Sequence, residues 1–210
     1  MKKLNYTIEQ VELLGHVEQK IRKLFLENPV PAHGIEHISR VVEWARKIAP
    51  KEKAKSIFLC ELAAWLHDIG RLREDNPGED SRKHHELSYV MLQEWFREDR
   101  VFDILSKKEK LELLYAVRYH WNNMADKYDT AWILRDADKL DAFGKVGIER
   151  VKELFPKDEE WNLYLRHIYE IFIHVCTKTA KKIIKDKKLM AAVEKEYKSY
   201  LKSKIEPVEL

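Results

Sequence analysis

Cysteine, glycine and proline are all scarce in this chain, and each scarcity excludes a class of structure. The 210 residues include two cysteines, six glycines and six prolines. Cys60 and Cys176 lie far apart within helical patterns, so we expect two free, buried thiols, as is usual in a reducing cytoplasm. The few glycines and prolines argue against long irregular loops and against a β-rich fold.

Long apolar runs are missing as well. No stretch approaches the roughly 20 residues that cross a bilayer, and the N-terminus lacks the apolar core of a secretory signal. The net charge of +3 is too small to argue for a nucleic-acid partner. With 45% apolar and 36% charged residues, the composition is typical of a globular protein. We therefore expect a cytoplasmic protein without a membrane partner, and an oligomer is compatible with this composition.

Apolar residues recur at helical spacing along the chain, whereas the alternation typical of strands is missing. Thr7 with Gln10, and Ser106 with Glu109, form capping boxes that predict two helix starts. The lysine-rich stretch 178–188 lacks interleaved aromatic residues, which favours a solvated helix face over a nucleic-acid surface. No repeat, low-complexity tract or linker divides the sequence. It therefore predicts an all-α fold with a single domain over residues 1–210.

A histidine and an aspartate lie side by side at the end of the apolar run ELAAWLHDIG. They are His67 and Asp68, and we predict that a helix from about Glu52 to Gly70 ends in this pair. Polar groups are costly to bury without compensation. A divalent metal ion would supply it, because imidazole nitrogens and carboxylate oxygens are both metal ligands. The alternative is a hydrogen-bonded or solvated pair.

Histidine recurs near the ends of other predicted helices. His33 and His37 are four residues apart and share one face if their helix begins early enough. His84 and His85 open a helix, and His120 follows another apolar run. Each of these histidines alone would ordinarily be structural, but their recurrence favours a function. Since two ligands hold a metal weakly, His37 is a candidate for a further ligand.

A second unusual stretch, DADKLDAFG, follows an apolar run and contains three aspartates within six positions. Asp138 and Asp141 are near neighbours on a helix, whereas Asp136 and Asp138 point about 200° apart. One metal ion therefore cannot readily take all three, and Asp138 is the candidate ligand. The alternative is a helix face paired with Lys139 and Lys145.

Taken together, these pieces resemble the HD-domain superfamily of metal-dependent phosphohydrolases. The resemblance rests on His37 in H-x-x-R-V, His67 and Asp68 in L-H-D-I-G, Asp138 in D-A-D-K-L-D-A-F-G, and the intervening histidines. It covers roughly residues 31–150. It implies an HD-type helical bundle whose metal-site core is about 31–150, with C-terminal helices of about 158–205 packed on it. The implied metal ligands are His37, His67, Asp68 and Asp138.

The same resemblance implies a second ion, because members with two metals use two further histidines between the dyad and the last aspartate. His85 in H-E-L-S and His120 in Y-H-W stand in those places, and His84 competes with His85. The ions would be Mn, Mg, Ni, Co, Fe or Zn. The cyclic-dinucleotide branch of the family carries a G-Y-P motif, which this sequence lacks.

The activity implied by the resemblance is hydrolysis of a phosphate mono- or diester, on a nucleotide or related small molecule, by a metal-activated water. Asp68 and Arg71 are the implied catalytic residues. Substrate phosphate would be bound by four side chains, namely His33, Arg40, Arg71 and Lys139. Two other classes stay open: a di-iron oxygenase built on the same six ligands, and a non-catalytic module that binds metal or nucleotide.

Overall fold

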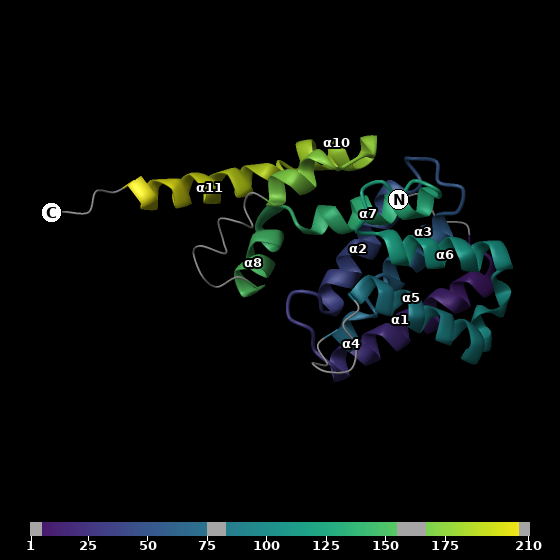
Figure 1. The fold of residues 1–210 in the computed structure, drawn as a ribbon. Helices are drawn as coiled ribbons and strands as arrows, with labels where there is room; N and C mark the ends of the chain where they lie inside the picture. Colours follow the sequence, from purple (N-terminus) through teal and green to yellow (C-terminus); the bar gives the residue numbers. More distant parts are fainter. Residues whose placement is uncertain (1–5, 75–82, 155–166, 206–210) are drawn as a thin grey trace.

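The computed structural model describes residues 6–74, 83–154 and 167–205, and no strand occurs among them (Figure 1). The predicted all-α fold is confirmed. Residues 167–173 are helical, and the other helices are α1 (Ile8–Glu27), α2 (Ile35–Ile48), α3 (Ile57–Leu66), α4 (Arg71–Glu74), α5 (His84–Glu98), the 3₁₀ helix η1 (Arg100–Ile104), α6 (Lys107–Tyr119), α7 (Asp129–Asp141), α8 (Gly144–Leu154), α10 (Lys178–Asp186) and α11 (Leu189–Ile205).

Both predicted capping boxes are present. The Thr7 hydroxyl accepts a hydrogen bond from the Gln10 backbone N–H, and the Gln10 side chain accepts one from the Thr7 backbone. Ser106 and Glu109 make the same reciprocal pair at the start of α6. Each box satisfies N–H groups that the first turn of a helix otherwise leaves without a partner.

The centre of the bundle is α3, in which every residue from Phe58 to Leu66 is buried. A helix that is apolar on all sides must be covered on all sides, and α3 packs against α1, α2, α6 and α7. The predicted span of 52–70 was wrong at both ends. Lys53 lies at a φ of 55°, which no helix continues through, and Ser56 caps the helix instead. His67 and Asp68 lie in the turn that follows α3.

The turn after α3 touches the start of α5 directly, and Gly70 makes this approach possible. A Cβ atom on Gly70 would lie 2.1 Å from the His84 carbonyl oxygen and 2.4 Å from the Ser88 backbone nitrogen. The Gly70 N–H also donates to the Ser88 hydroxyl at 2.8 Å. The absence of a side chain at residue 70 therefore brings the first turn of α5 against the His67–Asp68 turn.

The C-terminal part of the described chain packs on the bundle through α10, which contacts α7, and extends away from it through α11. After α7, Gly144 adopts a φ of 73° and α8 begins. α11 packs on α8 and, as the yellow helix in Figure 1, extends away from α1–α7. The expected C-terminal region starts at about residue 158, and residues 158–166 lie outside the described part of the chain.

Two further expectations needed correction. Cys60 is buried, as expected, but Cys176 is exposed, because it follows the helical residues 167–173 at the surface end of α10. The charge and turn formers of residues 71–83 indicate an exposed loop, but this segment begins with the helical turn α4, and residues 75–82 lie outside the described part of the chain. None of the described helices has the combination of length and apolarity that a membrane crossing requires.

We predict that Gly70→Ala destabilises the fold by about 3 kcal/mol, because the new methyl group would overlap the backbone of α5. Urea unfolding followed by circular dichroism measures this change. Gly15→Ala is the matched control: it lies inside α1 with nothing within 4 Å of the added Cβ, so it should stabilise by about 0.5–1 kcal/mol. Equal effects of the two substitutions would contradict the close approach at Gly70.

Candidate metal centre

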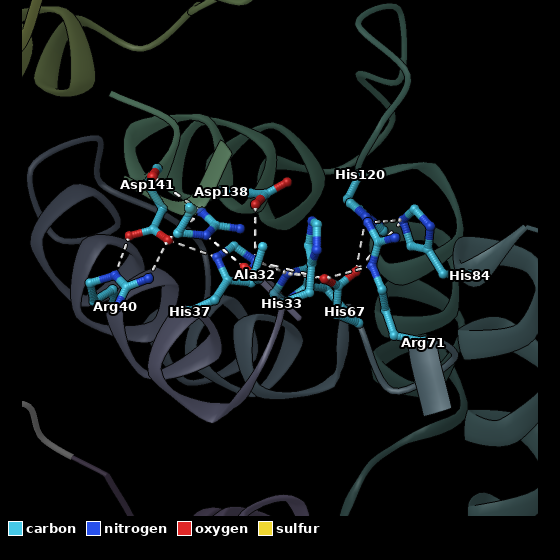
Figure 2. A network of polar contacts seen from close by, with 12 residues as sticks. Ala32, His33, His37, Arg40, His67, Arg71, His84, His120, Asp138 and Asp141 are labelled. Carbon is cyan, nitrogen blue, oxygen red and sulfur yellow. Dashed lines mark hydrogen bonds and ion pairs between the residues drawn. The ribbon is translucent and has the colours of Figure 1, made fainter. Parts of the chain in front are cut away.

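Six side chains from five parts of the bundle converge in two adjoining groups (Figure 2). α2 supplies His37, the turn after α3 supplies His67 and Asp68, and α5 begins with His84. His120 follows the last residue of α6, and Asp138 lies on α7. The first group consists of His37, His67 and Asp138, and the second of Asp68, His84 and His120. Within each group the potential ligand atoms all lie within 4.8 Å of one another.

The side chain of Asp68 lies between the two groups. Its Oδ2 atom is 3.7 Å from the Nε2 atoms of both His37 and His67. Its Oδ1 atom is 3.6 Å from Nε2 of His84 and 3.8 Å from Nε2 of His120. These separations are too long for hydrogen bonds. One carboxylate therefore presents a different oxygen to each group.

The protonation pattern of the histidine rings follows from their Nδ1 atoms. Nδ1 of His67 is 2.8 Å from the Ala64 carbonyl oxygen, and Nδ1 of His120 is 2.7 Å from the Val117 carbonyl oxygen. A carbonyl can only accept, so these Nδ1 atoms carry the hydrogen. A neutral imidazole has one N–H, so Nε2 of each ring is left as an unprotonated donor atom for a metal.

The other two rings of the groups follow the same pattern with carboxylates. Nδ1 of His37 donates to Oδ2 of Asp141 at 2.7 Å, and Nδ1 of His84 lies 3.4 Å from Oε1 of Glu74. Carboxylate partners behind metal-binding histidines orient the ring and raise its basicity.

Burial favours the neutral form of the His37, His84 and His120 rings. It lowers the pKa of His37 and of His84 below the ordinary value, and it lowers the pKa of His120 to about 4. Desolvation disfavours the charged imidazolium, and neighbouring histidines add to the effect at His120. Near neutral pH the Nε2 atoms are therefore available as ligands.

This arrangement fits a divalent cation. Nε2 of His37 is 3.4 Å from Nε2 of His67 and 3.4 Å from Oδ1 of Asp138. Two unprotonated nitrogens face each other here, which is unfavourable unless a cation lies between them. Donors roughly 2.1 Å from one ion, at angles of about 90–110°, lie roughly 3.0–3.4 Å apart. The spacing in the first group therefore matches ligands of a common ion.

The buried carboxylates provide a second test of fit. Glu61 accepts from Tyr6 and Arg46, and Asp136 accepts from two backbone N–H groups after residue 175. By contrast, Oδ1 of Asp68 is buried and has no hydrogen-bond partner among the described residues. An unsatisfied buried carboxylate oxygen is costly, and a bound cation would remove that cost.

The carboxyl groups of Asp68 and Asp138 remain ionised. Burial alone would raise the pKa of Asp68, but the His67 ring and the Arg71 guanidinium, with Nε at 3.2 Å, hold it well below its usual value. The pKa of Asp138 is also lowered: burial acts to raise it, and the adjacent His37 and His67 rings outweigh that effect. Ionised carboxylates and neutral imidazoles form a ligand set suited to a divalent transition metal.

The structure places His84, rather than His85, beside Asp68. The His85 ring instead lies against Trp121, with centroids 5.1 Å apart, and its Nδ1 is buried without a hydrogen-bond partner in the described chain. Both residues begin α5, but the contact at Gly70 turns His84 toward the dyad. From the sequence, His85 was the assigned ligand and His84 its competitor, so the structure brings the competitor to the group in place of His85.

The side chains expected to bind substrate phosphate do not all lie beside the two groups. Arg71 contacts Asp68, and Arg40 is bonded to Asp141 through Nε at 2.6 Å. His33 precedes the first residue of α2 rather than lying on its face, yet its ring is 5.5 Å from the His37 ring. Lys139 is not brought to the groups, because its ammonium donates to the Asn123 side chain and the His174 carbonyl.

Two residues around the groups were not assigned roles from the sequence. The sequence pattern marks Asp141 only as a helical neighbour of Asp138, and a helix face paired with Lys139 and Lys145 would give it no particular role. Arg150 donates to Asp141 and to the Ala32 carbonyl, 118 positions away. No local pattern signals a contact of that separation. A cavity of about 490 Å³ opens beside His37 and is lined in part by Arg40 and Arg150.

Comparisons with known proteins agree with this geometry. The family model of the HD domain matches residues 34–143. Among solved structures, a predicted HD superfamily hydrolase from an uncultured Thermotogales bacterium is 28% identical, with a TM-score of 0.65 over 90% of this chain and 92% of that one. No curated protein matched the chain.

Two other solved structures resemble the fold. Bacillus subtilis YpgQ in complex with ADP is 20% identical, with a TM-score of 0.65 over 97% of this chain and 100% of that one. An HD-superfamily hydrolase from Bacillus thuringiensis is 19% identical, with a TM-score of 0.64 over 94% and 100% of the two chains. At 19–20% identity, these two structures show a similar fold and nothing further about this chain.

We predict that the metal-free protein loses stability in acid. The pKa of His120 is about 4 when folded and 6.5 ordinarily, so between these values the unfolded chain binds a proton that the folded chain does not. The free energy of unfolding should fall by about 3 kcal/mol as the pH falls through this window. Urea unfolding across pH 4–7 measures it. His120→Asn should reduce the slope and His174→Asn, at an exposed histidine, should not; equal slopes in all three proteins would refute the assignment.

We also predict two Mn²⁺ binding events per chain in calorimetric titrations of the metal-free protein. His84→Ala and His120→Ala should each abolish the weaker event, because each removes a ligand of the second group. His85→Ala is the matched control and should retain both, since its ring faces Trp121. Loss of the weaker event in His85→Ala alone would show that the second group is wrongly composed.

Proposed function

This chain belongs to the HD domain family, and we propose that it is a metal-dependent phosphohydrolase acting on a phosphate mono- or diester of a small molecule, with nucleotides as the substrate class. The observation that carries the proposal is the convergence of four unprotonated Nε2 atoms with the carboxylates of Asp68 and Asp138. A hydrolase function is also consistent with the HD superfamily hydrolase from the Thermotogales bacterium.

Each group would hold one divalent ion. His37, His67 and Asp138 would bind the first, and His84 and His120 the second, with Asp68 contributing one oxygen to each. When bound, such ions supply an activated water and polarise a phosphoryl oxygen. The burial of the groups limits the entry of bulk water, which strengthens electrostatic interactions with substrate.

Arg71 is the cation best placed to bind the phosphoryl group. Its Nε donates to Asp68 and its Nη1 donates to Glu74 at 2.9 Å, so the guanidinium is held at the edge of the second group. A fixed guanidinium adjacent to the metal ligands can neutralise charge that develops on phosphoryl oxygens. Asp68, which stays ionised, is proposed to orient the attacking water and accept a hydrogen bond from it.

His33 and Arg40 remain proposed substrate contacts, since both lie around His37, where the cavity opens. A volume of about 490 Å³ is within the usual range for a small-molecule pocket. Lys139 is left out of the proposal, because its ammonium is already bonded to Asn123 and His174.

A nucleotide is favoured as substrate by the surface next to His120. Trp121 follows this histidine and is 56% exposed, and Met124, nearby in sequence, is 84% exposed. One face of the Trp121 ring lies against His85. An exposed indole offers a nucleobase a surface for stacking. Bacillus subtilis YpgQ, which shares the fold, was crystallised in complex with ADP.

The test begins with elemental analysis of protein purified without added metal. Metal-free protein, with and without Mn²⁺, is then incubated with nucleoside mono- and triphosphates, cyclic nucleotides and sugar phosphates, and the products are separated by chromatography. We expect Mn²⁺-dependent hydrolysis of a nucleotide, abolished in Asp68→Ala. Tightly retained iron with oxygen consumption and no hydrolysis would support an oxygenase instead. Metal binding without any turnover would support a binding module.

Trp121→Ala tests the nucleotide assignment separately. We predict a roughly 10-fold higher KM for the nucleotide with little change in kcat, because stacking on an aromatic ring is worth about 1–3 kcal/mol per base. Turnover of a sugar phosphate should be unaffected. Trp44→Ala on α2, where the ring lies under Lys47, is the matched control and should leave both KM values unchanged. An unchanged KM in Trp121→Ala would exclude this ring from substrate binding.

A further inference from the structure

Asp141 is a buried carboxylate that joins three helices, α2, α7 and α8. Its oxygens accept from Nδ1 of His37 at 2.7 Å, from Nε of Arg40 at 2.6 Å and from Nη1 of Arg150 at 2.6 Å (Figure 2). Nη2 of Arg40 adds a fourth bond at 3.0 Å. Asp141 lies at the end of α7, whereas its partners come from α2 and α8. All four contacts come from side-chain nitrogens, so the carboxylate acts as an acceptor in each of them.

The bond from His37 fixes more than the packing of α2 on α7. An ionised carboxylate at Nδ1 requires the hydrogen to be on that nitrogen, so Nε2 is free to face His67 and Asp138. The same hydrogen bond also fixes the rotation of the imidazole ring about its Cβ–Cγ bond. A histidine ligand without such a partner can adopt the other tautomer or turn away.

Arg150 extends this connection to the segment before α2. Its Nε donates to the Ala32 carbonyl at 2.6 Å, while Nη1 donates to both the backbone and the side chain of Asp141. Ala32 has a φ of 57°, in the left-handed region that residues with a side chain rarely adopt. Such a conformation persists only when its surroundings hold it. The next residue is His33, whose ring lies 5.5 Å from that of His37.

We propose that Asp141 and Arg150 are positioning residues of the metal centre. Asp141 sets the tautomer and orientation of His37, and Arg150 fixes the position of Asp141 relative to the Ala32–His33 segment. The inference rests on the metal centre proposed above. Under this proposal α8 contributes a residue to the metal centre, although Arg150 lies beyond the residues that the HD family model matches.

A purely structural role for these ion pairs makes a different prediction. It would lower the stability of the fold when either residue is replaced, but folded molecules would bind metal as before. A positioning role changes the affinity for metal and the tautomer of His37 in molecules that remain folded. Metal affinity and tautomer are therefore the measurements that separate the two.

The experiment compares wild-type protein with Asp141→Asn, Arg150→Gln and Arg150→Lys. Arg22→Gln is the matched control, since Arg22 forms an ion pair with Glu18 on the surface of α1. Calorimetry measures the affinity for Mn²⁺ alone. Nuclear magnetic resonance of ¹⁵N-histidine-labelled, metal-free protein reports which ring nitrogen of His37 carries the hydrogen. Circular dichroism confirms that each variant is folded.

We expect Asp141→Asn to weaken Mn²⁺ binding by roughly 10–100-fold, as is usual for residues directly behind a metal ligand. The Nδ1–H tautomer of His37 should no longer dominate. Arg150→Gln should weaken binding less, on the order of 10-fold, and Arg150→Lys should restore part of it, because a single ammonium cannot reach both partners equally. Arg22→Gln should match wild type in both measurements.

Wild-type affinity and an unchanged His37 tautomer in folded Arg150→Gln and Asp141→Asn would overturn the inference. If Asp141→Asn does not fold, the two Arg150 variants decide, because their partly exposed side chain can be replaced with less disturbance. If the wild-type protein itself binds no Mn²⁺, the proposed function fails, and the tautomer in the metal-free variants still decides whether Asp141 and Arg150 position His37.

Discussion

The hydrogen bond at Nδ1 of each converging histidine is the interaction on which the site depends. In His67 and His120 it ends on a backbone carbonyl three residues earlier, so the local turn fixes the ring. In His37 and His84 it ends on a carboxylate from elsewhere in the chain. Since every Nδ1 is used, every Nε2 faces the centre as an electron-pair donor. A cation placed between these electron pairs would relieve their mutual repulsion, which is why the arrangement fits a metal ion.

The fold brings these donors together by burying a helix on all sides. α3 carries no polar face, so neighbouring helices surround it and the turn at its end cannot reach bulk solvent. His67 and Asp68 are therefore buried together with the ends of α5 and α6, which supply the second group. Gly70 determines how closely α5 approaches this turn. The absence of a side chain at residue 70 thus allows the first turn of α5, with His84, to lie against the turn that carries Asp68.

Much of this could be predicted from the sequence, because helical periodicity, capping boxes and the His–Asp dyad are local patterns. The all-α fold and the two caps needed only residues a few positions apart. His84 and His85 could not be separated in this way, because the choice depends on a contact between Gly70 and α5. Arg150 could not be found, since its partners lie at Ala32 and Asp141. The boundary of α3 depended on Lys53 at a positive φ, which the residue type does not signal.

The two groups differ in the side chains that contact their donor atoms, and this difference predicts unequal affinities for the proposed ions. In the first group, His37 and His67 are fully buried, and their Nε2 atoms face only each other and carboxylate oxygens. In the second, Nη2 of Arg71 lies 3.5 Å from Nε2 of His84 and can donate to the same lone pair that a metal would use. A cation there must also approach the positive charge of Arg71. Asp68, shared by both groups, is drawn toward Arg71 through Oδ2 while its Oδ1 stays without a hydrogen bond among the described residues. If both groups hold ions as proposed, we therefore expect the first group to bind its ion more tightly than the second.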